Sequence, residues 1–408
     1  MPDNNINSNS LESSKVFANG GDLEGASSKV SLLGKFKGAL HIAVIPGDGI
    51  GPEVTHQSIR VLNAIAEKFD HEFQYTYCLM GADAIDKTGN PLPDDTIEVC
   101  LNSDAILFGA IGHPKYDNDP SAKVRPEQGL LRIRKVLQLF ANIRPVTTYP
   151  SLQHLSPLKS KQLDDVDFII YRELTGGIYF GKKEINEDQT EASDLCIYNK
   201  TEIERIAHLA FNAAQIRRKK LTLVDKANVL ETSRLWRKVV QQLAPSYPDV
   251  AVDYFFVDNA AMQLILNPRQ FDVILTENMF GDILSDEASV ITGSLGLLPS
   301  SSIGNSSALF EPIHGSYPQA AGKDIANPLG SILSAAMMLD HFKLHQEAQL
   351  VREAVEWTIN NGFVTRDIDP VNSYFTSTVG DLIIDYVSSR IPGAVNKKNI
   401  ELRKSTII

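Results

Sequence analysis

The chain has 408 residues, of which 43% are hydrophobic and 22% charged, and its formal net charge at pH 7 is −11. This length allows two domains with large hydrophobic cores, and the composition is that of ordinary globular proteins. The negative charge argues against nucleic acid as a partner, and no apolar run approaches the roughly 20 residues that a membrane span requires.

Residues 1–39 are rich in Ser, Asn and Gly and include several acidic residues. This segment is too acidic and too poor in Arg for a typical organelle transit peptide, and it lacks the apolar stretch of a secretory signal. We therefore expect it to be a disordered leader. The three cysteines lie far apart and form no metal-binding or redox spacing, so we expect reduced thiols and a cytoplasmic location.

Regular structure is predicted to begin at the apolar run 40–45, which ends at a glycine-rich turn and precedes an amphipathic helix. Similar short runs follow at 105–108, 168–171, 221–224 and 273–275, with helical patterns between most of them, for example at 203–217 and 231–243. Short runs that are apolar on both faces and alternate with helices predict an α/β fold with a buried, largely parallel sheet.

The turn after the first run, residues 47–51, has the pattern G-x-G-x-G. A dinucleotide-binding Rossmann turn has the pattern G-x-G-x-x-G, whereas here Pro52 follows directly. The turn therefore does not indicate a Rossmann fold.

Charged residues stand at or just after the ends of several predicted strands, namely Arg172, Asp225, Lys226, Asp258 and Glu277. Ligands in α/β folds gather beyond the carboxyl ends of strands, so this placement favours a binding site. Lys226 could act as a general base if burial and a nearby metal lower its pKa. The alternative is an ordinary salt bridge between Lys226 and a neighbouring carboxylate.

Two aspartates, Asp282 and Asp286, are four residues apart in a helical pattern, which places both carboxylates on one face of a helix. Asp258 precedes them by about two dozen residues. Crowded carboxylates repel each other unless a cation lies between them, and Mg²⁺ and Mn²⁺ prefer oxygen ligands of this kind. The pattern predicts a divalent metal site, with a solvated acidic helix face as the alternative.

Three arginines, Arg134, Arg144 and Arg172, lie near predicted strand and helix ends. A guanidinium group can bind a carboxylate through two parallel hydrogen bonds. The three side chains could therefore hold an acidic substrate, although each taken singly could equally be a surface or ion-pair residue.

Taken together, these regions closely resemble the isocitrate/isopropylmalate family of β-decarboxylating dehydrogenases, and within it the isopropylmalate branch. The resemblance covers essentially residues 40–387. Its most specific strings lie, in family order, at residues 45–52, 125–145, 172–181, 224–231, 257–261, 277–286, 293–299 and 311–328.

The resemblance implies two α/β domains that share a large mixed sheet, and not a Rossmann fold. It also implies a discontinuous cofactor-binding domain at 40–139 and 293–392. A domain for dimerisation and for substrate and metal binding would occupy 140–292, with a C-terminal tail at 393–408.

The resemblance also implies a role for each candidate residue. The metal, Mg²⁺ or Mn²⁺, would be held by Asp258, Asp282 and Asp286. The substrate would contact Arg134, Arg144, Arg172, Leu130 and Asp258. Tyr179 and Lys226 would form the catalytic pair. Lys226 and Asp258 would reach the site from the second subunit of a homodimer, so active sites would be shared, and the segment 181–198 would be an arm that clasps the partner.

The implied activity is the NAD-dependent oxidation and metal-assisted decarboxylation of 3-isopropylmalate to 4-methyl-2-oxopentanoate in leucine biosynthesis. Isocitrate members of the family carry a serine and an asparagine where this chain has Gln128 and Leu130. An apolar Leu130 suits an isopropyl group and would leave a third carboxylate unpaired. The alternatives are an enzyme for D-malate or tartrate, and a catalytically silent structural homologue.

The family binds the adenine end of its cofactor on the loop 314–322, which closes at Asn327. The implied cofactor contacts are Glu127, His314, Gly315, Ser316, Gln319 and Asn327. NAD-specific members usually carry an acidic residue where Gln319 stands, and NADP-specific members carry a lysine there followed by a tyrosine, whereas here Ala320 follows. We predict NAD, with weaker discrimination than an acidic residue would provide.

Overall fold

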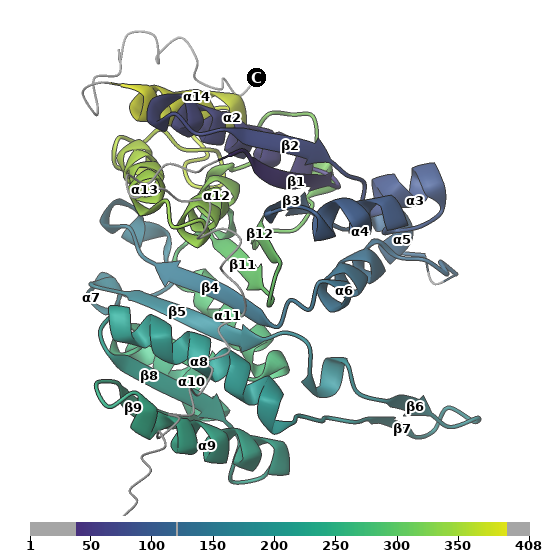
Figure 1. The fold of residues 1–408 in the computed structure, drawn as a ribbon. Coiled ribbons are helices and arrows are strands. Elements are labelled where there is room, and N and C mark those ends of the chain that lie inside the picture. Colours follow the sequence, from purple (N-terminus) through teal and green to yellow (C-terminus); the bar gives the residue numbers. More distant parts are fainter. Residues whose placement is uncertain (1–37, 120, 390–408) are drawn as a thin grey trace, which may run out of the picture.

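The computed structural model describes residues 38–119 and 121–389 (Figure 1). The predicted leader therefore lies outside the described residues except for its last two positions, and the predicted tail at 393–408 lies outside them entirely. None of the helices in the described ranges is both long and apolar enough to cross a membrane.

A mixed sheet of ten strands runs through the molecule in the order β2-β1-β3-β12-β11-β4-β5-β10-β8-β9. In chain order its strands are β1 (Leu40–Gly47), β2 (Phe73–Tyr77), β3 (Ala105–Ala110), β4 (Ala141–Thr147), β5 (Asp167–Glu173), β8 (Lys220–Asp225), β9 (Ala251–Phe256), β10 (Val273–Thr276), β11 (Pro299–Ile303) and β12 (Ala308–Pro312). The large mixed sheet expected from the resemblance is confirmed.

The two flanks of the sheet, β2-β1-β3-β12 and β5-β10-β8-β9, are parallel. They join through β11 and β4, which run antiparallel to their neighbours. The apolar runs predicted five strands of the parallel flanks, β1, β3, β5, β8 and β10. They did not predict β2, β9 and β12 of the flanks, nor the antiparallel centre.

Helices accompany both flanks (Figure 1). Those of the first flank are α2 (Gly51–Phe69), α3 (Ala82–Thr88), α4 (Asp94–Leu101), α5 (Pro114–Asp117), α6 (Pro126–Val136), α12 (Leu329–His341), α13 (His345–Asn360) and α14 (Thr376–Ser388). Those of the second flank are α7 (Ser160–Leu163), α8 (Lys200–Ile216), α9 (Glu231–Leu243), α10 (Val257–Leu266) and α11 (Asn278–Ile291).

Alternating strand residues place the helices of the second flank on opposite faces of the sheet. Leu221 and Leu223 of β8 pack in a core with residues of α8 and α9. Val224 of β8 and Ile274 of β10 pack in another core with residues of α10 and α11. Successive side chains of a strand point to opposite faces, so this division follows from the apolar character of both faces.

A two-stranded hairpin of β6 (Lys183–Ile185) and β7 (Ala192–Asp194) extends away from the body of the molecule (Figure 1). Its residues are exposed. The domain boundaries and the clasping role of this arm stay predictions.

Candidate active site

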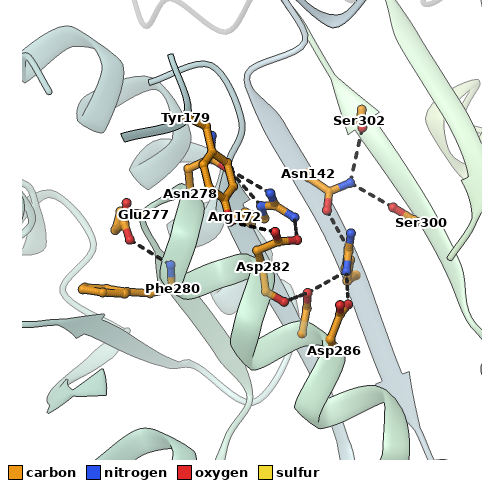
Figure 2. Close-up of polar contacts among 12 residues, drawn as sticks. Asn142, Arg172, Tyr179, Glu277, Asn278, Phe280, Asp282, Asp286, Ser300 and Ser302 are labelled. Carbon is orange, nitrogen blue, oxygen red and sulfur yellow. Dashed lines mark hydrogen bonds and ion pairs between the residues drawn. The ribbon is translucent and has the colours of Figure 1, made fainter. Parts of the chain in front are cut away.

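Part of the candidate site lies on two antiparallel strands at the centre of the sheet, β4 and β5. Asn142 of β4 is paired directly with Arg172 of β5, and Arg144 stands two residues beyond Asn142. Directly opposed residues and residues two apart share one face of a sheet, so all three side chains lie on the same face. Helix α11 packs over this face, and its acidic side chains meet the arginines there (Figure 2).

Each of the two aspartates of α11 pairs with one of these arginines, and Figure 2 labels Asp282, Asp286 and Arg172. The Arg172 Nη1 group donates to Asp282 Oδ1. The Arg144 Nη1 group lies 3.0 Å from Asp286 Oδ1 and 2.7 Å from Ser285 Oγ. The spacing of four residues does place Asp282 and Asp286 on one helix face, and that face is turned towards cationic groups.

Arg172 is almost completely buried, with 5% of its surface exposed. Burial lowers the pKa of its guanidinium group to about 10, while Asp282 opposes the shift and the charges of Arg144 and Arg134 add to it. The side chain still carries its charge at neutral pH. Because three cationic groups act on one another here, the site can bind a ligand with more than one carboxylate.

Arg134 approaches from α6 and donates through Nη2 to Glu311 Oε1 of β12 at 3.1 Å. Its Nε atom is buried and has no hydrogen-bond partner among the described residues. A buried donor without a partner is costly, so an anionic ligand that reached Nε would relieve this cost.

Tyr179 ends the short 3₁₀ helix η2 (Gly177–Tyr179) and donates its hydroxyl hydrogen to Asp282 Oδ2 at 3.0 Å. Partial burial raises the pKa of the Tyr179 phenol, and the hydrogen bond to Asp282 raises it further. The phenol is therefore protonated at neutral pH and able to donate a proton.

Lys226 and Asp258 form a second group at the carboxyl ends of β8 and β9. The Lys226 Nζ atom lies 2.9 Å from Asp258 Oδ1. The hydrogen bond from Lys226 is the main cause of the lowered pKa of the exposed Asp258 carboxyl. This is the salt bridge that the sequence left open as an alternative for Lys226.

The three aspartates are not brought together within one chain. No group of three or more His, Cys, Asp or Glu side chains that could hold a metal occurs in the ranges 38–119 and 121–389. Asp282 and Asp286 could supply two carboxylate ligands from α11, a donor set that suits Mg²⁺ or Mn²⁺. Asp258 stands apart from them with Lys226.

The loop from His314 to Gly322 packs against the turn that follows β1. The Ile50 amide donates to the Ser316 carbonyl oxygen at 2.8 Å, and the Gly322 amide donates to the Glu53 carboxylate. A Cβ atom at Gly49 would lie only 2.0 Å from the Ser316 carbonyl oxygen. The glycine-rich turn therefore permits close approach of this loop, which is a different role from that of a Rossmann turn.

The predicted cofactor residues lie in and around this loop. The His314 Nε2 atom is buried without a hydrogen-bond partner among the described residues, and burial lowers the pKa of this imidazole. Asn327 is buried, and its Nδ2 group donates to Asp367 at 3.0 Å. Gln319 and Gly315 are exposed on the loop.

The two remaining predicted residues lie on α6. Glu127 is exposed and Leu130 is half-buried against the core beneath it. The neighbouring Gln128 caps this helix, because its Oε1 atom accepts from the Arg125 amide at 3.2 Å.

Sequence reasoning missed several residues of the site. Asn142, Asn278 and Ser285 all contact the arginines, yet only the strand register and the position of α11 reveal this. A hollow of about 560 Å³ beside Asp48 and His113 was also missed, and none of the predicted site residues lines it.

A family model for isocitrate/isopropylmalate dehydrogenases matches residues 41–383. The chain is 55% identical to a 3-isopropylmalate dehydrogenase of Bacteroides fragilis over 348 residues, and this aligned region covers 85% of this chain and 98% of the relative. It is 56% identical to a 3-isopropylmalate dehydrogenase of Bacillus subtilis over 333 residues, and this aligned region covers 80% of this chain and 91% of the relative.

Two solved structures are also similar. The isocitrate dehydrogenase from Methylococcus capsulatus matches with a TM-score of 0.76 and 34% identity, over 86% of this chain and 100% of that chain. A β-decarboxylating dehydrogenase from Thermococcus kodakarensis matches with a TM-score of 0.72 and 37% identity, over 85% of this chain and 96% of that chain.

Proposed function

The chain belongs to the isocitrate/isopropylmalate dehydrogenase family, and we propose that it oxidises and decarboxylates 3-isopropylmalate to 4-methyl-2-oxopentanoate with NAD. The observation that carries this proposal is the pairing of Arg144 and Arg172 with the acidic face of α11, together with Arg134, whose charge acts on Arg172. In the reaction C2 gives up a hydride to NAD⁺ and its hydroxyl group loses a proton, which forms a ketone; the bond from C3 to its carboxylate then breaks to release CO₂, and C3 gains a proton. This is a step of leucine biosynthesis.

The arginines bind the two carboxylates of the substrate. Arg172 and Arg144 each direct Nη1 at a carboxylate of α11, and the buried Arg134 Nε atom has no hydrogen-bond partner among the described residues. Oriented binding of both carboxylates holds C2 and C3 in place for the successive steps.

Tyr179 serves as the general acid that protonates C3 after CO₂ has left. Its raised pKa keeps the proton available at neutral pH. Lys226, supplied by the other subunit, takes the hydroxyl proton as the general base. Its side chain pairs here with Asp258 of the same chain.

Asp282 and Asp286, joined by Asp258 of the partner subunit, would hold Mg²⁺ or Mn²⁺. The bound cation would polarise the substrate oxygens, and bound NAD⁺ would accept the hydride. The all-carboxylate donor set supports a hard cation, and the separation of Asp258 from the other two ligands within one chain agrees with a shared site.

Exposed apolar side chains support a homodimer. On α10, α11 and the arm, the large apolar residues with at least two-fifths of their surface exposed are Ile185, Leu195, Ile197, Met262, Ile265, Leu266, Ile283 and Val290. Apolar surface of this extent, on the elements that carry Asp258 and Asp282, is typical of an interface. A dimer formed there would bring the two half-sites together.

Substrate choice is assigned to α6. Gln128 is engaged in capping the helix, and Leu130 offers an apolar surface at the position where a third carboxylate would otherwise be bound. This favours the isopropyl group of 3-isopropylmalate over the additional carboxylate of isocitrate.

NAD is favoured over NADP because Gln319 is neutral and Ala320 offers no donor for a 2′-phosphate. His314 and Asn327 fit the cofactor role, since His314 Nε2 is a buried nitrogen without a partner in the part of the chain that the structure describes, and Asn327, shortly after the loop, is a buried amide. The discrimination is weaker because Gln319 stands where an acidic residue would otherwise be, and Lys323, an exposed cation, follows four residues after Gln319 in the chain. We also propose a cytoplasmic location and closure of the two predicted domains over the substrate.

Absorbance of NADH tests the activity, with Mg²⁺ and a panel of 3-isopropylmalate, D-malate, tartrate and isocitrate. The proposal predicts the highest kcat/KM for 3-isopropylmalate. A higher value for another 2-hydroxy acid would reassign the substrate, and no turnover with any acid would identify a catalytically silent homologue.

A further inference from the structure

Two buried asparagines, Asn278 and Asn142, accept hydrogen bonds from the guanidinium groups of Arg172 and Arg144. The Asn278 Oδ1 atom accepts hydrogen bonds from Arg172 Nε at 3.0 Å and from Arg172 Nη2 at 2.9 Å (Figure 2). The Asn142 Oδ1 atom accepts from Arg144 Nε at 2.8 Å. Both asparagines are 1% exposed, so neither is available to a ligand directly.

The amide nitrogen of Asn142 is fixed by the adjoining strand. It donates to Ser300 Oγ at 2.9 Å, to the Ser301 carbonyl oxygen at 3.2 Å and to Ser302 Oγ at 3.3 Å. Because these three groups accept hydrogen bonds from Asn142 Nδ2, the Oδ1 atom of the same carboxamide points towards Arg144. A rotation of the group would place its NH₂ against the guanidinium and lose both sets of bonds.

Asn278 is fixed in a corresponding way. Its Nδ2 group donates to the Gly176 carbonyl oxygen at 3.2 Å. Its backbone amide donates to the Tyr198 hydroxyl at 3.0 Å, and that hydroxyl donates to Glu277 Oε2 at 3.0 Å. Tyr198 leaves no room for a side chain at Gly176, where a Cβ atom would lie 2.7 Å from its ring.

The two asparagines differ from ordinary ion-pair partners of arginine because they carry no charge. A carboxamide is neutral, so it orients a guanidinium group without cancelling the positive charge. Each arginine keeps Nη1 for an anion, which is now Asp282 for Arg172 and Asp286 for Arg144. A carboxylate in place of either asparagine would compete with a substrate for that charge.

We propose that Asn278 and Asn142 are positioning residues that aim Arg172 and Arg144 at the substrate carboxylates. This rests on the proposed role of the arginines in substrate binding. A merely structural role would lower stability and affect substrate and cofactor alike, whereas a positioning role affects substrate affinity selectively.

The test compares Asn278→Ala with Thr292→Val. Thr292 lies just beyond the end of α11 and is also buried, and its hydroxyl donates to the backbone carbonyl oxygens of Ser289 and Ser294. Binding of 3-isopropylmalate with Mg²⁺ is measured by calorimetry on the full chain, with thermal unfolding, kcat and both KM values. We expect Asn278→Ala to weaken substrate binding about tenfold, with kcat and the KM for NAD changed by less than about threefold. Thr292→Val should bind as the wild type does.

Asn142→Ala provides a second variant on a different element, and the same selective loss is expected. Wild-type affinity in either folded variant, or an equal loss for NAD, overturns the inference. If the wild type binds 3-isopropylmalate but does not turn it over, the proposed function fails while the comparison of affinities still decides this inference. If the wild type does not bind the acid at all, both are wrong.

Discussion

Asp282 accepts hydrogen bonds from two proposed functional groups at once, Arg172 on Oδ1 and the Tyr179 hydroxyl on Oδ2. The guanidinium group of Arg172 also lies 6.0 Å from the centre of the Tyr179 ring. One carboxylate on α11 therefore links a substrate arginine to the proposed general acid. If these residues have the proposed roles, a change at Asp282 is expected to affect substrate binding, proton donation and metal binding together.

Tyr179→Phe removes the proton donor and leaves the ring in place. We expect overall turnover to fall by about 10²-fold, in the range typical of a lost general acid. Because oxidation precedes protonation, a rapid first release of NADH should persist in a stopped-flow measurement while the following steady rate is slow. An unchanged steady rate would remove Tyr179 from the acid role.

The aspartates of α11 differ in burial, and this predicts different effects on stability. The Asp282 side chain is 35% exposed and faces a buried arginine, whereas Asp286 is 71% exposed. We expect Asp282→Asn to lower the free energy of unfolding by about 1–2 kcal/mol and Asp286→Asn by less than about 0.5 kcal/mol. Urea unfolding measures both values.

Metal affinity should not follow this order. Both aspartates are proposed ligands, so both variants should bind Mn²⁺ at least about tenfold more weakly, as measured by electron paramagnetic resonance. Wild-type Mn²⁺ affinity in either folded variant would exclude that carboxylate from the metal site.

Gln319 is the position that most directly tests cofactor choice. Gln319→Asp should raise the ratio of kcat/KM for NAD to that for NADP by about tenfold, because a carboxylate accepts from the ribose hydroxyls and repels a 2′-phosphate. Lys323→Ala should shift the ratio in the same direction by removing the nearby cation. A wild-type kcat/KM for NADP equal to or above that for NAD would contradict the predicted preference.

His341 gives a dependence of stability on pH away from the site. Burial, assisted by the charge of Lys343, lowers the pKa of this imidazole from its usual 6.5 to about 4. Between these pH values the unfolded chain binds a proton that the folded chain does not, so the free energy of unfolding decreases as the pH falls through this window. In His341→Gln, urea unfolding should show a shallower decrease between pH 6.5 and 4; an identical slope would contradict this cause.

The sequence predicted those parts of the fold that depend on local pattern. Apolar runs identified β1, β3, β5, β8 and β10, and the spacing of Asp282 and Asp286 identified a common helix face. Strand β11 was not identified, because its Pro-Ser-Ser-Ser-Ile sequence lacks an apolar pattern and serves as a polar partner for Asn142. Such a strand is specified by its neighbours and not by its own periodicity.

The pairing of arginines with aspartates could not be predicted from either sequence segment alone. It depends on the antiparallel register that sets Arg172 opposite Asn142, and on the packing of α11 over that face. Two apparently independent motifs, the arginines and the acidic pair, thus belong to one site. The contributions of Asp258 and Lys226 to a second subunit stay predictions.

Mixing two inactive variants tests the shared active site most directly. Tyr179→Phe and Lys226→Ala chains with different affinity tags are co-expressed, and heterodimers are purified and assayed with 3-isopropylmalate, NAD and Mg²⁺. If Tyr179 of one subunit works with Lys226 of the other, each heterodimer has one intact site of two, and about half the wild-type turnover per dimer is expected. Heterodimers no more active than the average of the two parent homodimers would show that both residues act within one chain, which contradicts the account.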